Sequence, residues 1–264
     1  AEAINNLAEA YSKLGELTVA IKYYEQALKL NPKLIAIYSN IGVNYAKLGQ
    51  INLAFHHYEK ALSIDSDFAE ARFNLSLLQI ENNFIPEGFK NYEARWKSNN
   101  FPSHRRQFSM PRWVGESLLG KNILIWAEQG IGDEFQFSTL IPEFEKLDCK
   151  VGIECAAKVV EIFQWSFPWA EVRETGAIHC EGSEIYSQFD YQIPMGSLAL
   201  IFRTTLDDFR NFQKPYIPRL KEGELKVRDK LKLKEGQFLV GLSWRSSLQK
   251  GYRSKLYLDV EDLA

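Results

Sequence analysis

The residues best suited to chemistry lie in a short turn in the middle of the chain, Trp126–Asp133. The turn follows the apolar run Asn122–Trp126, which has the pattern of a buried parallel strand, and precedes a helical pattern from Glu134 to Leu147. Its two glycines permit a tight turn with positive φ and close approach of a ligand. Asp133 falls where the helix starts, so we expect it to be the N-cap or a carboxylate at the carboxyl end of the strand, where open α/β sheets bind ligands.

Two chemistries compete at this turn, phosphate binding and proton abstraction. Gly130 and Gly132 begin the G-x-G-x-x-G spacing of dinucleotide sites, and Glu154 follows at the place of a ribose-binding acid. However, Phe135 replaces the third glycine, and Asp133 would repel a pyrophosphate. A general base is therefore favoured, because an ionised carboxylate at this place can accept the proton of an attacking sugar or protein hydroxyl.

A second group of candidate residues follows the last predicted strand, residues 238–244. The loop after it holds four cations and three serines within residues 245–255. Such groups suit the phosphates of a nucleoside diphosphate, which need cations opposite the base; a solvated surface loop is the alternative. The residues expected to bind donor phosphates are Arg245, Ser246, Lys250, Arg253, Ser254 and Lys255.

The first hundred residues repeat with a period of 34. Three sets of positions show the period: apolar Leu7, Ile41 and Leu75; small Ala8, Gly42 and Ser76; and aromatic Tyr24, Tyr58 and Tyr92. Small residues where paired helices touch and aromatic residues where units stack resemble the tetratricopeptide repeat, against the alternative of a plain helical bundle. The resemblance covers about three units, residues 1–97. It weakens in the third, where Gln79 replaces a tyrosine and Arg95 an alanine, as expected of a terminal unit joined to something else.

Asparagine also recurs with this period, at Asn6, Asn40 and Asn74. Stacked units would place three carboxamides in a row, each able to donate to and accept from the backbone of an extended peptide. Such a ladder resembles the concave face of the repeat domain in O-linked N-acetylglucosamine transferases, and the resemblance implies a protein or peptide partner. The alternative is that asparagine merely tolerates a solvent-facing helix position.

The second half of the chain alternates between strands and helices. Predicted strands cover residues 151–154, 171–173 and 189–194, and predicted helices cover residues 156–163, 197–202 and 222–233. This alternation predicts a Rossmann-like α/β domain with a parallel sheet and helices on both faces. In the connector, residues 98–120, His104 is expected to be exposed. Arg105 and Arg106 are expected to form a solvated basic turn, with contact to a phosphate as the alternative. The rings of residues 92–96 and 111–113 are expected to form the seam between the two domains.

The segment Trp126–Asp133, with Phe137 and Pro142 downstream, resembles the Gly-x-Gly-Asp turn of heptosyltransferase-like glycosyltransferases. The whole chain resembles bacterial tetratricopeptide-repeat proteins that carry such a module, with further matching segments at residues 92–96, 111–116, 202–206 and 240–244. The resemblance implies the GT-B architecture, two Rossmann-like domains with the active site between them. It also implies that Asp133 is the base and that a nucleotide sugar is the donor substrate, with no cofactor. The acceptor side would then contain Glu128, Gln129, Gly130 and Gly132.

The expected domains are repeats at residues 1–97, a connector at 98–120, a first Rossmann-like domain at 121–237 and the start of a second at 238–264. In that family the second domain holds most of the donor, so the resemblance implies that this piece alone is inactive. Two functions stay open: a glycosyltransferase whose repeats bind the acceptor or a partner, and a non-catalytic scaffold with a degenerate glycosyltransferase domain.

Composition narrows the function classes further. The 264 residues carry 32 Lys and Arg against 34 Asp and Glu, a net charge of −2, which gives no attraction to nucleic acid or anionic membranes. Three cysteines without a CxxC pair argue against a metal site or a disulfide framework and for a reducing, cytoplasmic setting. No apolar run reaches the roughly 18 residues needed to span a bilayer.

Overall fold

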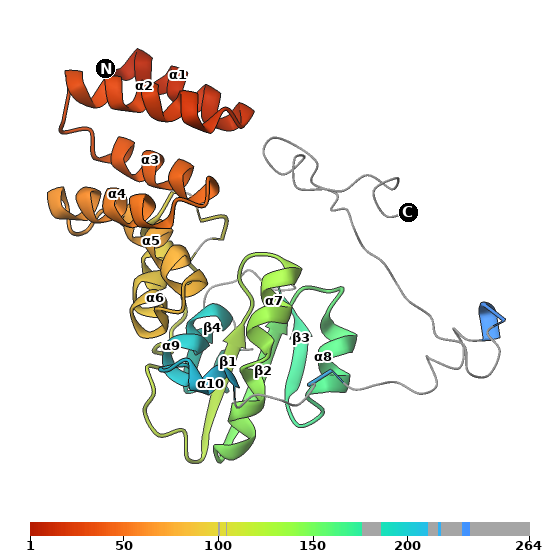
Figure 1. Ribbon diagram of the computed structural model, residues 1–264. Helices are drawn as coiled ribbons and strands as arrows, with labels where there is room; N and C mark the ends of the chain where they lie inside the picture. The colour runs from red at the N-terminus through yellow and green to blue at the C-terminus, as the bar shows by residue number, and fades with distance from the viewer. Residues whose placement is uncertain (100, 104, 176–185, 211–215, 218–228, 233–264) are drawn as a thin grey trace. The chain divides into compact units, whose positions relative to one another are not determined.

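The computed structural model describes residues 1–99, 101–103, 105–175, 186–210, 216–217 and 229–232 (Figure 1). The described residues fall into two compact units, one built on residues 1–74 and the other on residues 75–219. His104, the predicted strand 238–244 and the cationic loop 245–255 lie outside the described residues, and the predicted helix 222–233 is described only at residues 229–232.

The first unit is a series of antiparallel helix pairs. Its helices are α1 (Glu2–Leu14), α2 (Leu17–Leu30), α3 (Ile35–Lys47), α4 (Ile51–Ile64) and the beginning of α5 (Ala69–Glu81). Helix α1 packs on α2, α3 on α4, and α2 on α3. The turns repeat as well, because the Asn31 and Asp65 side chains each accept the backbone N–H of the residue two positions on. The predicted 34-residue period is therefore confirmed as a structural repeat.

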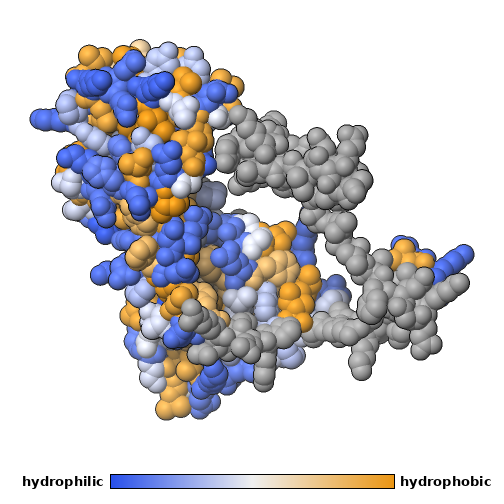
Figure 2. Space-filling model, in the orientation of Figure 1, coloured by the Kyte–Doolittle hydropathy of each residue, from blue (hydrophilic) through white to orange (hydrophobic). Residues whose placement is uncertain are grey.

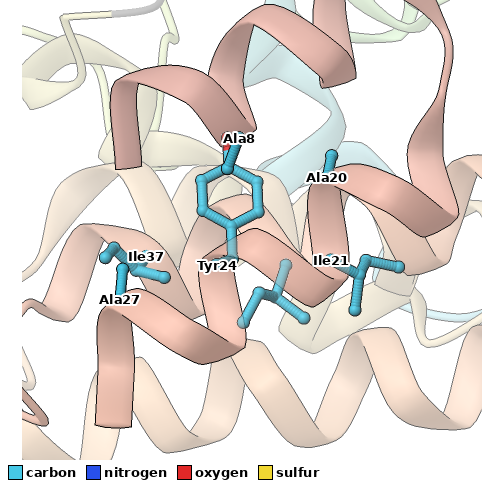
Figure 3. Close-up of a cluster of buried hydrophobic side chains, with 7 residues drawn as sticks. Ala8, Ala20, Ile21, Tyr24, Ala27 and Ile37 are labelled. Carbon is cyan, nitrogen blue, oxygen red and sulfur yellow. The ribbon is translucent and has the colours of Figure 1, made fainter. Parts of the chain in front are cut away.

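The repeated small and aromatic positions form the core of this unit. Tyr24 is buried beside three alanines with no exposed surface, Ala8, Ala20 and Ala27 (Figure 3). Their equivalents in the next repeat are also buried, and a Cβ on Gly42 would come within 2.6 Å of the Tyr58 ring. Outside this core, hydrophilic and hydrophobic side chains are interspersed over the visible surface (Figure 2).

The third repeat keeps a contact between its two helices although both aromatic residues of that contact are replaced. Tyr11 stacks on Tyr23 with 5.4 Å between ring centroids, and Tyr45 stacks on His57 at the equivalent positions, also at 5.4 Å. In the third repeat the same two positions are Gln79 and Asn91, and the Asn91 Nδ2 donates to Gln79 Oε1 at 2.8 Å. A hydrogen bond thus replaces the ring stack between α5 and α6 (Ile85–Tyr92), so the Gln79 substitution preserves the contact.

The second unit contains a four-stranded parallel sheet. Its strands are β1 (Lys121–Trp126), β2 (Cys149–Cys155), β3 (Glu171–Glu174) and β4 (Tyr191–Pro194), in the order β3-β2-β1-β4. All three pairings are parallel, and β1 is central and almost wholly buried. The chain moves outward from β1 to β3 and then returns to the other side of β1, so the strand order reverses between β1 and β4. Such a reversal creates the crevice in which open α/β sheets bind ligands.

Helices and 3-10 turns lie between the strands and after β4. They are α7 (Ile131–Ser138), η2 (Ile141–Lys146), α8 (Val160–Ser166), η4 (Met195–Ser197), α9 (Leu198–Phe202) and α10 (Asp207–Arg210), and η1 (Glu93–Lys97) follows α6. The predicted helix from Glu134 to Leu147 is wrong, because α7 ends at Ser138 and a separate η2 follows. Pro142 lies in the first turn of η2 and has no N–H to continue an α-helix. The predicted helix 156–163 begins later, at Val160.

Among the described residues, no helix is long and apolar enough to cross a membrane.

Candidate functional site

The turn after β1 is held by side chains around it rather than by its glycines. Gly130 is the N-cap of α7 and is extended, with φ −109° and ψ 171°. The positive φ predicted for a glycine lies instead at Gln129, with φ 66°. The Gln129 backbone N–H donates to Ser103 Oγ at 2.6 Å, and its side-chain Nε2 donates to the Tyr92 hydroxyl at 2.6 Å. These two bonds fix a residue without the conformational freedom of glycine in the left-handed region.

Asp133 is the third residue of α7 rather than its N-cap. Its Oδ2 accepts the Gly130 N–H at 3.2 Å, and its own backbone N–H donates to the Gly130 carbonyl at 2.9 Å, so the side chain closes the first turn of the helix. The side chain is half-buried. The space beside the two glycines is open, since a Cβ on Gly132 would meet nothing within 4 Å and one on Gly130 only the Asp133 carboxylate at 3.7 Å.

Glu128 is buried and paired with an arginine from the end of the repeats. The Arg95 Nη2 lies 2.9 Å from Glu128 Oε1 and 3.0 Å from Oε2, and Nε lies 3.2 Å from Oε2. Neither side chain has any exposed surface. This two-pronged contact between guanidinium and carboxylate is the geometry that makes such pairs strong.

Three further residues complete this group, which we name the Arg95 cluster: Glu93, Arg95, Arg112, Glu128 and Ser197. Glu93 Oε1 accepts from Arg95 Nη1 at 2.9 Å and from the Ser197 hydroxyl at 2.7 Å, and Arg112 Nη2 lies 2.6 Å from Glu93 Oε2. Ser197 Oγ also accepts from Arg95 Nη2 at 2.8 Å. The two arginines and the two glutamates of the cluster carry equal and opposite charge, as a buried group of ions requires.

Burial and charge act on the two carboxyl groups in different proportions. Burial is the largest influence on Glu128 and raises its pKa to about 7, although Arg95 opposes this rise. Burial also raises the pKa of Glu93, but the guanidinium groups of Arg95 and Arg112 outweigh it, so the pKa of Glu93 is lowered. The aromatic rings of Tyr92 and Trp96, each with its centroid 4.5 Å from Arg95 Cζ, add cation–π contacts.

The Arg95 cluster occupies the place where the strand order reverses. Glu128 lies two residues beyond β1, and Gly196 and Ser197 lie just beyond the neighbouring β4. A Cβ on Gly196 would collide with Glu128 Oε1, so only glycine leaves room for the carboxylate. The guanidinium of Arg95 therefore fills a crevice that in other α/β sheets receives a ligand.

The repeat register contained a signal for this cluster. Arg95 stands 34 and 68 residues after Ala61 and Ala27, both of which have no exposed surface. A charged residue at a position that buries alanine must find a buried partner. The sequence pattern located the position but not Glu128, which is 33 residues away.

A second ionic group involves Glu154, the candidate ribose-binding acid. Its carboxylate lies 2.6 Å from Arg106 Nη1 and 3.0 Å from Arg173 Nε, and the Arg106 Nη2 donates to the Tyr186 hydroxyl at 2.7 Å. The prediction of a solvated turn is wrong for Arg106, whose guanidinium lies 4.6 Å from the centre of the Phe108 ring. Arg105 is exposed.

The three recurring asparagines lie at equivalent positions of α1, α3 and α5. Asn40 is hydrogen-bonded to the Tyr24 hydroxyl, and the Asn74 Nδ2 donates to Ser39 Oγ at 3.2 Å. Asn6 is exposed, and its Oδ1 is 3.5 Å from Asn5 Nδ2. The first helix of each repeat thus carries the same polar group, and in two repeats this group also bonds to a helix of the preceding repeat, Asn40 to α2 and Asn74 to α3.

Comparison with known proteins supports the repeat assignment. Residues 1–67 match the sequence model of the family described as Tetratricopeptide repeat, so the N-terminal helices are tetratricopeptide repeats. Protein FlbA of Caulobacter vibrioides is 26% identical over 270 residues, which cover 96% of this chain and 45% of FlbA. The chain therefore spans about half the length of this relative.

Solved structures that resemble part of the chain include MamA and a tetratricopeptide domain of Spaghetti (RPAP3). MamA is 27% identical, with a TM-score of 0.33 over 35% of this chain and 54% of MamA. The first such domain of Spaghetti (RPAP3), bound to the HSP90 peptide SRMEEVD, is 18% identical, with a TM-score of 0.34 over 35% of this chain and 73% of that domain.

Proposed function

We propose that this protein is an interaction scaffold whose repeats dock an extended peptide across Asn6, Asn40 and Asn74. The observation that carries the proposal is the equivalence of these three asparagines on the first helices of successive repeats. A carboxamide provides both a donor and an acceptor, so a row of them can bind a peptide backbone whatever its side chains. Stacked repeats of this class use such extended faces for binding.

The Arg95 cluster supports a scaffold over an enzyme. A catalytic α/β domain needs an open crevice at the reversal of strand order, and here Arg95, Glu128 and Ser197 fill it. We propose a cytoplasmic setting for the scaffold, which is supported by Cys149 and Cys155, both free thiols.

Replacing Asn6, Asn40 and Asn74 together with alanine should abolish most peptide binding. A peptide selected from a random phage-displayed library on the chain, and then labelled, should bind the variant at least tenfold more weakly in fluorescence anisotropy, because each lost hydrogen bond contributes about 0.5–1.5 kcal/mol. Replacing the exposed Asn31 and Asn52 is the control and should leave the affinity unchanged. An unchanged affinity of the triple variant would remove the asparagines from the binding face.

We propose sugar transfer from a nucleotide sugar as the second candidate function. It is favoured by the half-buried Asp133 beside the open space at Gly130 and Gly132, close to the carboxyl end of β1. Asp133 would take the proton of the acceptor hydroxyl, and a GT-B arrangement with domains at residues 121–237 and from 238 onward would bring the cationic loop 245–255 to the donor phosphates.

Asp133→Asn separates this candidate from the scaffold. If the domain is catalytic, the variant of a longer protein with both domains should lose sugar transfer and keep its donor affinity, measured by thermal stabilisation with a panel of nucleotide sugars. Replacing the carboxylate that accepts the Gly130 N–H should lower the free energy of unfolding by only about 1 kcal/mol. Full turnover in the variant would exclude Asp133 as the base.

A further inference from the structure

A small cavity lies beside the Arg95 cluster. Its volume is about 290 Å³, and the residues that line it are Arg112, Trp113, Val114, Ser197, Leu200 and Ile201. Four of these six side chains are apolar, and of the six Arg112 alone carries a charge. Pockets for small molecules have this character, with mainly apolar walls and a few polar groups that fix the orientation of the ligand.

The walls of the cavity come from two segments that are both tied to β4. Residues 111–113 extend the sheet beyond β4, because the Trp113 N–H donates to the Gln192 carbonyl at 2.9 Å and the Gln192 N–H donates to the Pro111 carbonyl at 3.0 Å. The other wall belongs to η4 and α9, which follow β4 directly in the chain. The cavity is therefore formed by the fold itself.

Arg112 is the polar group that the cavity offers to a ligand. Its Nη2 lies 2.6 Å from Glu93 Oε2, but its Nε is buried and has no hydrogen-bond partner among the described residues. A buried donor without an acceptor is unfavourable. The Ser197 hydroxyl, in contrast, already donates to Glu93 Oε1 and accepts from Arg95 Nη2. A ligand thus meets apolar walls and one guanidinium.

The charge beside the cavity favours an anion. Burial raises the pKa of Glu128 to about 7, so near neutral pH a part of this carboxyl group is protonated. The Arg95 cluster then carries more positive than negative charge. An anion next to Arg112 would supply the missing negative charge, and a carboxylate matches the planar guanidinium best because it can accept two parallel hydrogen bonds.

We propose that this cavity binds a short, branched aliphatic carboxylate. Its carboxylate would accept from Arg112, and its branched chain would contact Leu200 and Ile201. A sugar fits less well, because the hydroxyl of Ser197 is already paired, and a polyanion would find one cation on the wall. The volume keeps the ligand small, since pockets for drug-sized molecules span roughly 300–1,000 Å³.

Isovalerate is the probe that tests this proposal. The whole chain, labelled with ¹⁵N, is titrated with isovalerate while ¹H–¹⁵N NMR follows the backbone amides of Val114 and Ile201, which should shift and saturate. Isovaleramide has the same branched chain without the charge. It should bind at least tenfold more weakly, because the ion pair with Arg112 is lost.

Two exposed residues of the same loop provide matched variants. Val114 lines the cavity and is 72% exposed, whereas Leu119 does not line it and is 70% exposed. Val114→Asp should weaken isovalerate binding at least tenfold, because it places one carboxylate next to another. Leu119→Asp should leave the affinity unchanged. Because both positions are exposed, both variants should fold, which thermal unfolding verifies.

Three results would overturn the proposal. The first is the absence of a saturable shift with isovalerate. The second is equal affinity for isovalerate and isovaleramide, or equal weakening by Val114→Asp and Leu119→Asp. The third is N-acetyl-leucine that binds at least tenfold more tightly than isovalerate, which would make the carboxyl-terminal residue of a peptide the occupant.

Discussion

Replacing Arg95 with alanine should lower the free energy of unfolding by about 3–5 kcal/mol, because the buried carboxylate of Glu128 would lose its cation. Arg95 has no exposed surface and makes three contacts of 3.2 Å or less with Glu128. The substitution restores the alanine found at the equivalent positions of the first two repeats, so local helix packing should tolerate it. Denaturant unfolding followed by circular dichroism measures the loss.

The double variant Arg95→Ala with Glu128→Gln distinguishes the contribution of the ion pair to stability from the contribution of side-chain packing. Once the carboxylate is neutral, loss of the guanidinium leaves no uncompensated charge, so the double variant should be more stable than the sum of the two single losses predicts, by about 2 kcal/mol. Additive losses would mean that the two side chains are not coupled and would contradict the role assigned to the Arg95 cluster.

Gly196→Ala should lower the free energy of unfolding by about 1–3 kcal/mol, the typical cost of overpacking a filled site. The added methyl group would collide with the Glu128 carboxylate and come within 3.3 Å of the Phe137 ring. Because both neighbours are buried, the strain cannot be relieved toward solvent. Thermal unfolding should show a midpoint lower by several degrees.

Gly132→Ala is the matched control. A Cβ at Gly132 meets nothing within 4 Å, and the residue lies inside α7, where alanine is a better helix former than glycine. Its stability should stay equal or rise slightly. A loss as large as that of Gly196→Ala would show that the effect comes from glycine replacement in general and not from contact with Glu128.

The repeats could be predicted from the sequence because each structural position recurs every 34 residues with the same type of side chain. One alanine or tyrosine says little, whereas Tyr24 and Tyr58 at the same register fix the helix pairing. The parallel sheet could also be predicted, since short strand patterns such as those of β1 and β2 are separated by helical patterns. The helix break before Pro142 was missed, although proline in a helical pattern usually marks such a boundary.

The Arg95 cluster could not be predicted in the same way. Its members come from η1, the connector before β1, the turn after β1 and η4, and only the reversal of strand order brings η4 next to Glu128. From the sequence, Arg95 was interpreted as a sign that the third repeat departs from the pattern. However, a charged residue at a position that is buried in the other repeats already indicated an ion pair with a distant residue. Similarly, the sequence predicted a positive φ at the glycines of the turn. The positive φ lies at Gln129 instead, which is held by hydrogen bonds to Ser103 and Tyr92 that the sequence did not reveal.

Two features support the proposed interaction scaffold, the Arg95 cluster at the reversal of strand order and the row of three asparagines on the repeats. Arg95 bonds to Glu128 and Ser197 where the strand order reverses, the place at which a catalytic α/β domain would bind its ligand, and this supports the proposed scaffold. In this account, the face for partners is that of Asn6, Asn40 and Asn74.

The measurement that tests this account most directly is a ¹H–¹⁵N NMR titration of the chain with the selected peptide, observing side-chain carboxamides and backbone amides together. The account predicts that the NH₂ signals of Asn6, Asn40 and Asn74 shift together and saturate at one peptide concentration, while the amides of Gly130 and Gly132 stay in place. Shifts confined to the turn at Gly130–Asp133, with the three asparagine signals unmoved, would contradict it.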